Sequence, residues 1–195
     1  CIEALSSSSK LEVSGGIIYL GGIYYEGTEP LVISGGKHSW IIVQSNCSDA
    51  VISGKNTEIG SFTFHFNPYK LYLKSSVKYI GFYDYYNVIS DGYAVATGYD
   101  GYQLTEDDLQ MIEVRNYIND LNDYEKRLEG NSIVMRKIVK DLQSDINNAA
   151  DNTETTFNIS DYDELTKGIL IPTGKKIKLT GTKNVTLASN FTGDY

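Results

Sequence analysis

The feature that most constrains this chain is the order of its segments. A stretch rich in tyrosine and glycine, with short apolar runs, extends to about residue 101; residues 105–150 have helical character; and β-like sequence returns after them. This order predicts an elongated α+β protein. We expect an N-terminal antiparallel β-sandwich or barrel, one long helix, and a C-terminal short helix followed by a β segment.

The helical stretch carries large side chains at alternating intervals of three and four residues. Such spacing places them on one stripe, the pattern of a coiled-coil seam. Because a seam buries nothing within one chain, it predicts partner helices, and the broad stripe favours a homotrimer. The predicted trimer seam consists of Val114, Tyr117, Leu121, Tyr124, Leu128, Asn131, Met135, Ile138 and Leu142.

Two features concern the start and the continuity of this helix. Thr105 followed by the acidic residues 106–108 predicts an N-cap and a first turn that suits the helix dipole. Asn131 falls on the seam, where a buried polar residue would fix the register of a trimer. The alternative is a helical hairpin broken at Gly130, because residues 129–132 also read as a stop followed by a new cap.

Residues 11–101 are predicted to form the antiparallel β-sandwich or barrel, called the β module here. Residues 1–10 are predicted to form a linker before it. Alternating apolar residues at 61–66 and 70–74 predict a hairpin that turns at Asn67 and Pro68. Its side chains would form part of a sandwich core. The predicted core consists of Val13, Ile18, Leu31, Ile33, Trp40, Ile42, Phe62, Phe64, Leu71 and Leu73.

Several tyrosines precede the helix and form a predicted contact surface of the β module. Tyrosine presents a rigid apolar ring with a polar tip, which suits an adhesive surface. We expect this surface to dock to a larger particle or to the trimer mates. Its residues are Tyr83, Tyr85, Tyr86, Tyr93 and Tyr99.

Residues 151–195 predict a short helix with Ser160 as its N-cap, followed by the start of a C-terminal β domain. After Gly168 the chain becomes apolar and then alternates through Ile177 and Leu179.

Composition and motifs exclude several classes of function. A net charge of −8, with a pI near 4.7 and no basic run, argues against nucleic acid or an anionic membrane as the main partner. No apolar run approaches the roughly 20 residues that membrane insertion requires. Cys1, Cys47, His38 and His65 have no metal-ligand spacing, and no nucleophile or phosphate-binding motif occurs. We therefore expect no cofactor and no enzyme activity.

Three segments of the β module resemble a known family. Residues 13–28 read VSGGIIYLGGIYYEGT and are followed by apolar runs at 30–33 and 39–43. This pattern resembles the opening β module of bacteriophage tail-fibre and baseplate proteins. The short helix and residues 169–179 resemble the entry to the parallel β-helix domain of phage tailspikes. The resemblance implies an extracellular virion protein that contacts other tail proteins and, through its C-terminal part, a host surface glycan or protein.

The sequence thus predicts a structural, receptor-directed component of a phage tail, assembling as a homotrimer. Several copies would attach the particle to its host by multivalent binding. Two alternatives remain open. One is a bacterial surface lipoprotein or adhesin anchored through Cys1. The other is a fragment of a polysaccharide-depolymerising tailspike.

Overall fold

The computed structural model describes residues 2–4, 10–44, 49–65, 70–116, 121–162 and 168–181. The chain divides into two compact units, Cys1–Lys137 and Ile138–Tyr195. Each unit is described by itself below. Cys1, through which the alternative lipoprotein would be anchored, lies outside the described residues, as do Cys47 and the predicted turn at Asn67 and Pro68.

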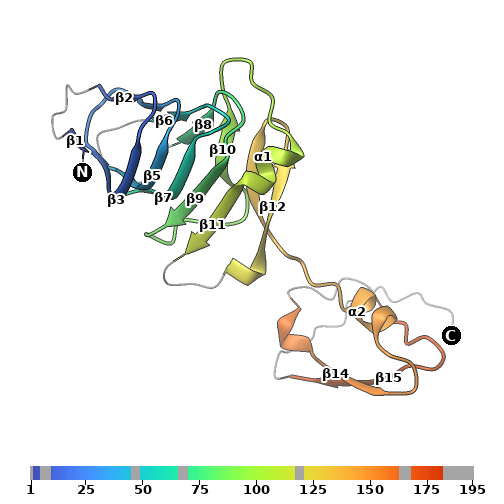
Figure 1. Cartoon of the computed structure of the whole chain (residues 1–195). Helices are drawn as coiled ribbons and strands as arrows, with labels where there is room; N and C mark the ends of the chain where they lie inside the picture. The colour runs from blue at the N-terminus through green and yellow to red at the C-terminus, as the bar shows by residue number, and fades with distance from the viewer. Residues whose placement is uncertain are drawn as a thin grey trace. The chain divides into compact units, whose positions relative to one another are not determined.

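The first unit contains two sheets between which the chain alternates (Figure 1). One sheet, called sheet A here, is parallel throughout and consists of β1 (Ile2–Ala4), β3 (Ile17–Tyr25), β5 (Lys37–Val43), β7 (Glu58–Phe64), β9 (Tyr79–Asp84) and β11 (Ile112–Asn116). Sheet B begins with the parallel strands β2 (Glu12–Val13), β4 (Leu31–Ile33), β6 (Asp49–Ile52), β8 (Lys70–Leu73) and β10 (Tyr93–Gly98). Each successive pair of strands forms one coil, so the unit is a parallel β-solenoid.

This topology corrects the predicted antiparallel sandwich. The two segments expected to form a hairpin, now β7 and β8, belong to different sheets. β7 pairs in parallel with β5 and β9, and β8 pairs in parallel with β6 and β10. Alternation of apolar and polar residues reports only that one face of a strand is buried. It does not identify the neighbouring strand or its direction, and the prediction failed for that reason.

Stacked rows of apolar side chains fill the solenoid. In sheet A, Ile41 lies in register with Phe62, and Phe62 with Phe82, all with at most 2% of their surface exposed. A second row in sheet B aligns Ile33 with Ile52, and Ile52 with Leu73. Burying a side chain of this size stabilises the fold by about 1.5–3 kcal/mol. The interior of the first unit is therefore a continuous core along the coils.

The predicted core is partly confirmed. Five of its members are buried, namely Leu31, Ile33, Phe62, Leu71 and Leu73, whereas Val13, Ile18, Trp40, Ile42 and Phe64 are only half-buried. In β5 the prediction has the wrong phase, because Ile41 and Val43 face the interior. Here β5 passes through an irregularity in its pairing with β3, which shifts the alternation by one residue.

Glycines form one corner of the solenoid. Gly16, Gly36 and Gly54 each adopt a φ of 92°, a conformation that other residues rarely adopt. A Cβ atom on Gly36 would lie 2.5 Å from the carbonyl oxygen of Gly16, one coil away. At this corner the backbone turns with a positive φ and packs closely against the backbone of the neighbouring coil. Both features require glycine.

Short elements end the first unit where one long helix was predicted. Thr105 caps α1 (Glu106–Met111) through a capping box with Asp108, so the predicted helix start is confirmed. The helix ends after six residues, and the chain enters β11, the short 3₁₀ turn η1 (Leu121–Asp123) and the antiparallel hairpin of β12 (Tyr124–Glu129) and β13 (Ser132–Lys137). β13 pairs antiparallel with β10 and so completes sheet B.

The predicted coiled-coil shaft is therefore wrong, and so is the alternative helical hairpin. Gly130 does reverse the chain, but between two strands, with a φ of 57° at the first position of a two-residue turn. The predicted seam residues fall on different elements: Val114 on β11, Leu121 on η1, Tyr124 and Leu128 on β12, Asn131 in the turn, Met135 on β13, Ile138 just after it and Leu142 on α2. Tyr117 lies outside the described residues.

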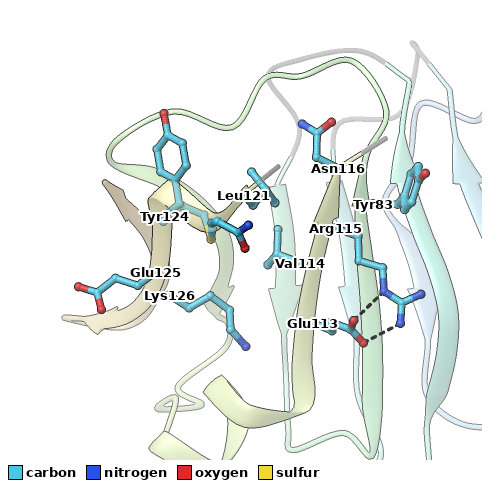
Figure 2. Close-up of a pocket in the computed structure, with 11 residues that line it drawn as sticks. Tyr83, Glu113, Val114, Arg115, Asn116, Leu121, Tyr124, Glu125 and Lys126 are labelled. Carbon is cyan, nitrogen blue, oxygen red and sulfur yellow. Dashed lines mark hydrogen bonds and ion pairs between the residues drawn. The ribbon is translucent and has the colours of Figure 1, made fainter. Parts of the chain in front are cut away.

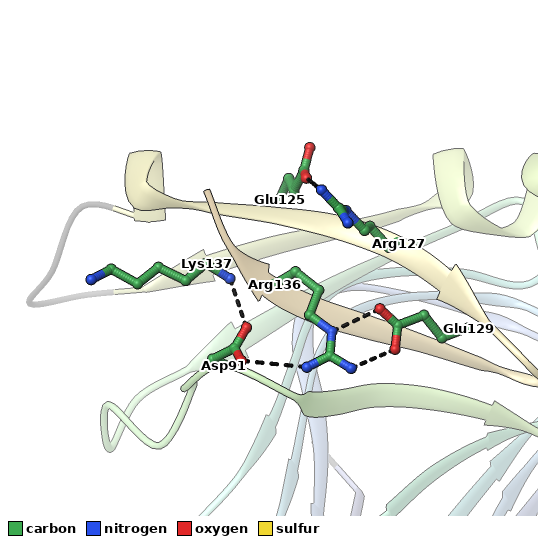
Figure 3. Close-up of polar contacts among 6 residues, drawn as sticks. All are labelled: Asp91, Glu125, Arg127, Glu129, Arg136 and Lys137. Atoms are coloured by element: carbon green, nitrogen blue, oxygen red, sulfur yellow. Dashed lines mark hydrogen bonds and ion pairs between the residues drawn. The ribbon is translucent and has the colours of Figure 1, made fainter. Parts of the chain in front are cut away.

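Arg136 links the two strands of the hairpin and also pairs with Asp91 in the loop before β10 (Figure 3). Arg136 donates to both carboxylate oxygens of Glu129, at 2.7 and 2.6 Å, and also reaches Asp91 at 3.4 Å. The backbone N–H of Lys137 donates to Asp91 at 2.9 Å. The two contacts to Asp91 join the hairpin to the loop that leads into β10.

The second unit has its own small core. It contains α2 (Leu142–Asn148), β14 (Glu154–Asn158), the 3₁₀ turn η2 (Ile159–Asp161) and β15 (Lys176–Thr180). β14 and β15 pair in parallel, as successive coils of a β-helix do. Leu142, Ile146 and Tyr162 are buried together. Asn158, rather than the predicted Ser160, caps η2, and residues 163–167 of the predicted short helix lie outside the described residues.

Candidate functional site

A row of polar and aromatic side chains follows the ends of four neighbouring strands of sheet A. We call it the corner row and define it as Glu26, Gln44, His65, Tyr85 and Tyr86. The backbone continues the sheet at Gln44, whose N–H donates to the carbonyl of Tyr25 at 2.8 Å, and at His65, whose N–H donates to that of Val43 at 2.9 Å. At Tyr85 the N–H turns back to the carbonyl of Tyr83 at 3.1 Å. Neighbouring strands lie about 4.8 Å apart, so the row presents side chains at that interval.

The side chains of the corner row contact one another. Gln44 hydrogen-bonds to Nδ1 of His65. The His65 ring stacks on Tyr85 at 5.9 Å and meets the edge of Tyr86 at 5.6 Å, while the two tyrosine rings lie 5.1 Å apart. Tyr85 and Tyr86 remain 49% and 47% exposed. From Gln44 to Tyr86 the side chains of the row are therefore in continuous contact, and its two tyrosine rings are the most accessible part.

The surroundings of His65 favour the uncharged form of its ring. Burial lowers its pKa below the ordinary value. The side-chain nitrogen of Gln44 lies against Nδ1 and donates to it when that ring nitrogen carries no proton. Nε2 of His65 is then the nitrogen that carries the proton.

Asp84 holds the loop that carries the two exposed tyrosines. Its buried carboxylate accepts hydrogen bonds from the backbone N–H groups of Val88 and Ile89, each at 3.0 Å, and from Asn116 at 3.1 Å. Asn87, in the same loop, has a φ of 56° and accepts a hydrogen bond from Asn116 at 3.0 Å. Charge-assisted bonds of this kind fix a turn more firmly than neutral ones.

The structure separates the other three tyrosines of the predicted contact surface. Tyr83 lies on β9 and lines the slot described below. Tyr93 packs against the core, and burial raises its pKa to about 12. Tyr99 follows β10 of sheet B, contacts Tyr72 at a ring distance of 5.1 Å and is 43% exposed.

A second feature is a slot of about 850 Å³ at the end of the solenoid (Figure 2). It lies between β11, the last strand of sheet A, and β12, the last strand of sheet B. We call it the edge slot, and it is lined by Tyr83, Glu113, Val114, Arg115, Asn116, Leu121, Asn122, Tyr124, Glu125, Lys126 and Met135. Four predicted seam residues thus meet here, although no helix brings them together.

Charged groups at the edge slot are engaged with their neighbours. Glu113 accepts hydrogen bonds from Arg115 at 2.7 and 2.8 Å and from the Tyr79 hydroxyl at 2.6 Å, which lower its pKa to about 2. The Lys126 ammonium donates to the carbonyls of Leu109, at 2.6 Å, and Ile112. Burial lowers the pKa of Lys126.

Sequence reasoning missed Gln44 and His65 as parts of a site. The signal was present, because each directly follows an apolar strand, but only the coil register shows that they are neighbours. The other histidine, His38, is 1% exposed, and its Nε2 donates to the carbonyl of Gly35 at 3.0 Å.

Searches for metal sites and membrane spans were negative for the part of the chain that the structure describes. No cluster of three or more potential metal ligands occurs there. No helix in the same residues has the length and apolar character needed to cross a membrane.

Comparison with known proteins identifies no relative: no family model, curated protein or solved structure matches the chain.

Proposed function

We propose that the chain is an attachment protein that binds a surface glycan through the corner row. The observation that carries this proposal is the continuous contact of an amide, an imidazole and two exposed phenol rings across neighbouring coils. Sugars present apolar C–H faces and hydroxyl edges. Tyrosine rings can cover the faces, while Gln44 and His65 can hydrogen-bond the hydroxyls.

The charge of the protein favours an uncharged glycan over an anionic one. With a net charge of −8, the surface as a whole repels polyanions. Burial lowers the pKa of His65 and so favours its neutral form, and the row contains no lysine or arginine, so it offers no fixed cation to hold a sulfate or carboxylate group. A neutral glycan is therefore the ligand that the row fits.

The row is also held in place before a ligand arrives. Asp84 fixes the loop of Tyr85 and Tyr86 by accepting two hydrogen bonds from its backbone, at Val88 and Ile89. The β-solenoid backbone fixes Gln44 and His65. A surface ordered in advance loses little conformational freedom on binding, which favours affinity.

We propose binding without hydrolysis. A glycosidase needs a carboxylic acid whose pKa is raised enough to donate a proton near neutral pH. Glu113 of the edge slot has its pKa shifted the opposite way, to about 2, by Arg115 and Tyr79. It is therefore a poor proton donor.

A phage tail remains the setting that we propose, on the strength of the resemblance in residues 13–28. The glycan site now lies in the first unit, whereas the sequence assigned host contact to the C-terminal part. We do not retain the homotrimer, because the helical seam that motivated it is absent from the described residues. Attachment by several copies per particle would still raise avidity.

A glycan array probed with the whole chain tests this proposal. We expect binding to a subset of neutral glycans and a loss of about 2- to 10-fold in affinity for Tyr85→Ala, the range expected for an aromatic contact. Tyr99→Ala is the matched control, since it removes an equally exposed ring outside the row. Absence of binding to every neutral glycan, or equal losses in both variants, would contradict the proposal.

A further inference from the structure

The residues that line the edge slot follow the strands without alternation. Residues 113–116 of β11 and residues 124–126 of β12 all contribute. Side chains on one face of a strand occur at every second residue, so a groove over a face would be lined by alternate residues. An unbroken run shows that the slot follows the edges of both strands.

These edges end their sheets. β11 is the last strand of sheet A and β12 the last of sheet B, and among the described residues neither pairs with a further strand on its outer side. The backbone N–H and C=O groups of such an edge are a template for another extended chain.

One contact shows which backbone groups face the slot. The carbonyl of Ile112, at the start of β11, accepts from Lys126 of β12 and so points across the slot. Backbone groups alternate in direction along a strand, so those of Val114 point the same way, whereas those of Glu113 and Arg115 point toward β9. Val114 therefore presents a donor and an acceptor to the slot.

The two sides of the slot differ in polarity. Figure 2 shows Val114 on one side of β11, and Glu113 with its ion-pair partner Arg115 on the other. Leu121 and Met135 add apolar surface next to Val114. A chain lying between the edges would meet apolar groups at every second residue and charged groups at the residues between.

We propose that the edge slot binds an extended peptide segment of a second polypeptide, added as a further strand beside β11. The segment alternates apolar residues with basic or hydroxyl-bearing ones, because its inward side chains meet Val114, Leu121 and Met135. Its outward side chains meet a protein of net charge −8. This is β-strand addition, in which the backbone supplies affinity and alternate side chains supply specificity.

Lys126 sets where the added strand can begin. Its ammonium already occupies the carbonyl of Ile112, and a lysine at a strand edge discourages indiscriminate pairing. The peptide therefore pairs at Val114 and leaves the Lys126 contact in place. The inference does not rest on the proposed glycan site, whose side chains follow β3, β5, β7 and β9. The two sites adjoin at Asn116, which lines the slot and donates to Asp84 below the loop of Tyr85 and Tyr86.

The test uses the whole chain and the acetylated, amidated peptide Thr-Val-Lys-Val-Thr-Val-Lys as the probe. We expect saturable binding by calorimetry and slower hydrogen exchange of the Val114 amide by NMR. The matched probe carries N-methyl groups on alternate amides, which remove the donors along one edge and keep every side chain. Methylating the edge that faces β11 should weaken binding by at least about tenfold.

Two variants separate the slot from other surfaces. Leu121→Trp fills the slot and should abolish peptide binding, whereas Val139→Trp adds the same ring at an exposed position of the second unit and should not. Circular dichroism checks that both variants fold. The inference is overturned if the peptide does not bind the wild-type chain at millimolar concentration, or if neither set of N-methyl groups changes its affinity.

Discussion

The side chain of Asn131 holds the backbone at Leu104: its Oδ1 accepts a hydrogen bond from the Leu104 N–H at 2.8 Å. Its Nδ2 donates to the carbonyl of Tyr102 at 2.9 Å. Asn131 occupies the turn of the terminal hairpin, so these two bonds join that turn to the segment that leads into α1. The same residue was expected to fix the register of a trimer, and it fixes a contact within one chain instead.

Asn131→Ala should destabilise the first unit by about 1–3 kcal/mol, because it leaves the Leu104 N–H and the Tyr102 carbonyl without this partner. Urea unfolding followed by circular dichroism measures the change. Asn148→Ala, at an exposed position at the end of α2, is the control and should change stability little. A stability equal to wild type for Asn131→Ala would show that the two bonds contribute nothing.

Phe62→Ala should cost about 3–5 kcal/mol, because Phe62 is fully buried between Ile41 and Phe82 and its removal opens a cavity. Phe64→Ala should cost less, since Phe64 is only half-buried. The sequence analysis predicts both rings in one sandwich core and hence similar losses of stability for the two variants. Chemical unfolding of the two variants measures the loss in free energy of unfolding. A larger loss for Phe64→Ala than for Phe62→Ala would contradict the solenoid register.

Gly36→Ala tests the glycine corner. An alanine at this position would have to adopt a φ of 92°. Its Cβ atom would also lie 2.5 Å from the carbonyl oxygen of Gly16. Positive φ alone costs about 1–2 kcal/mol for an ordinary residue, so we expect a loss of at least that size. Gly15→Ala is the matched control, because its Cβ would meet no atom within 4 Å. Similar melting temperatures for both variants would mean that the coils do not stack as described.

The pKa of Glu113 should be measurable near 2 by NMR titration, because Arg115 and Tyr79 stabilise its carboxylate. The folded pKa lies below the unfolded value of about 4.3. The stabilisation is therefore present above that value and is lost as the pH falls through 2. Arg115→Gln should raise the pKa of Glu113 toward 4.3. An unchanged pKa in this variant would show that the guanidinium is not the main cause.

The coil repeat is visible in the sequence, although the pattern of the individual strands does not predict it. Val13, Ile33, Ile52 and Leu73 are separated by 19 to 21 residues, and the structure places them in register across sheet B. A recurrence of this length indicates a solenoid. Strand composition, part of the core and the cap at Thr105 were predictable because they depend on local pattern.

The helical prediction failed because spacing alone cannot distinguish two structures. In the hairpin, Tyr124, Lys126 and Leu128 alternate along a strand, but the apolar pair among them also fits an interval of four in a helix. Gly130 and Asn131 between two such segments are typical of a two-residue hairpin turn. The same residues also fit the end of one helix and the start of another. Tyr85 and Tyr86 were predictable as contact residues, but their grouping with Gln44 and His65 was not, since these become neighbours only through the coil register.

The most direct test of the account is NMR of the tyrosine and histidine rings during titration with the strongest neutral glycan from the array. We predict that the ring signals of Tyr85, Tyr86 and His65 shift together and saturate at one affinity, while those of Tyr72 and Tyr99 stay in place. Shifts confined to Tyr72 and Tyr99, or a glycan that binds without moving any signal of the corner row, would contradict the proposed function.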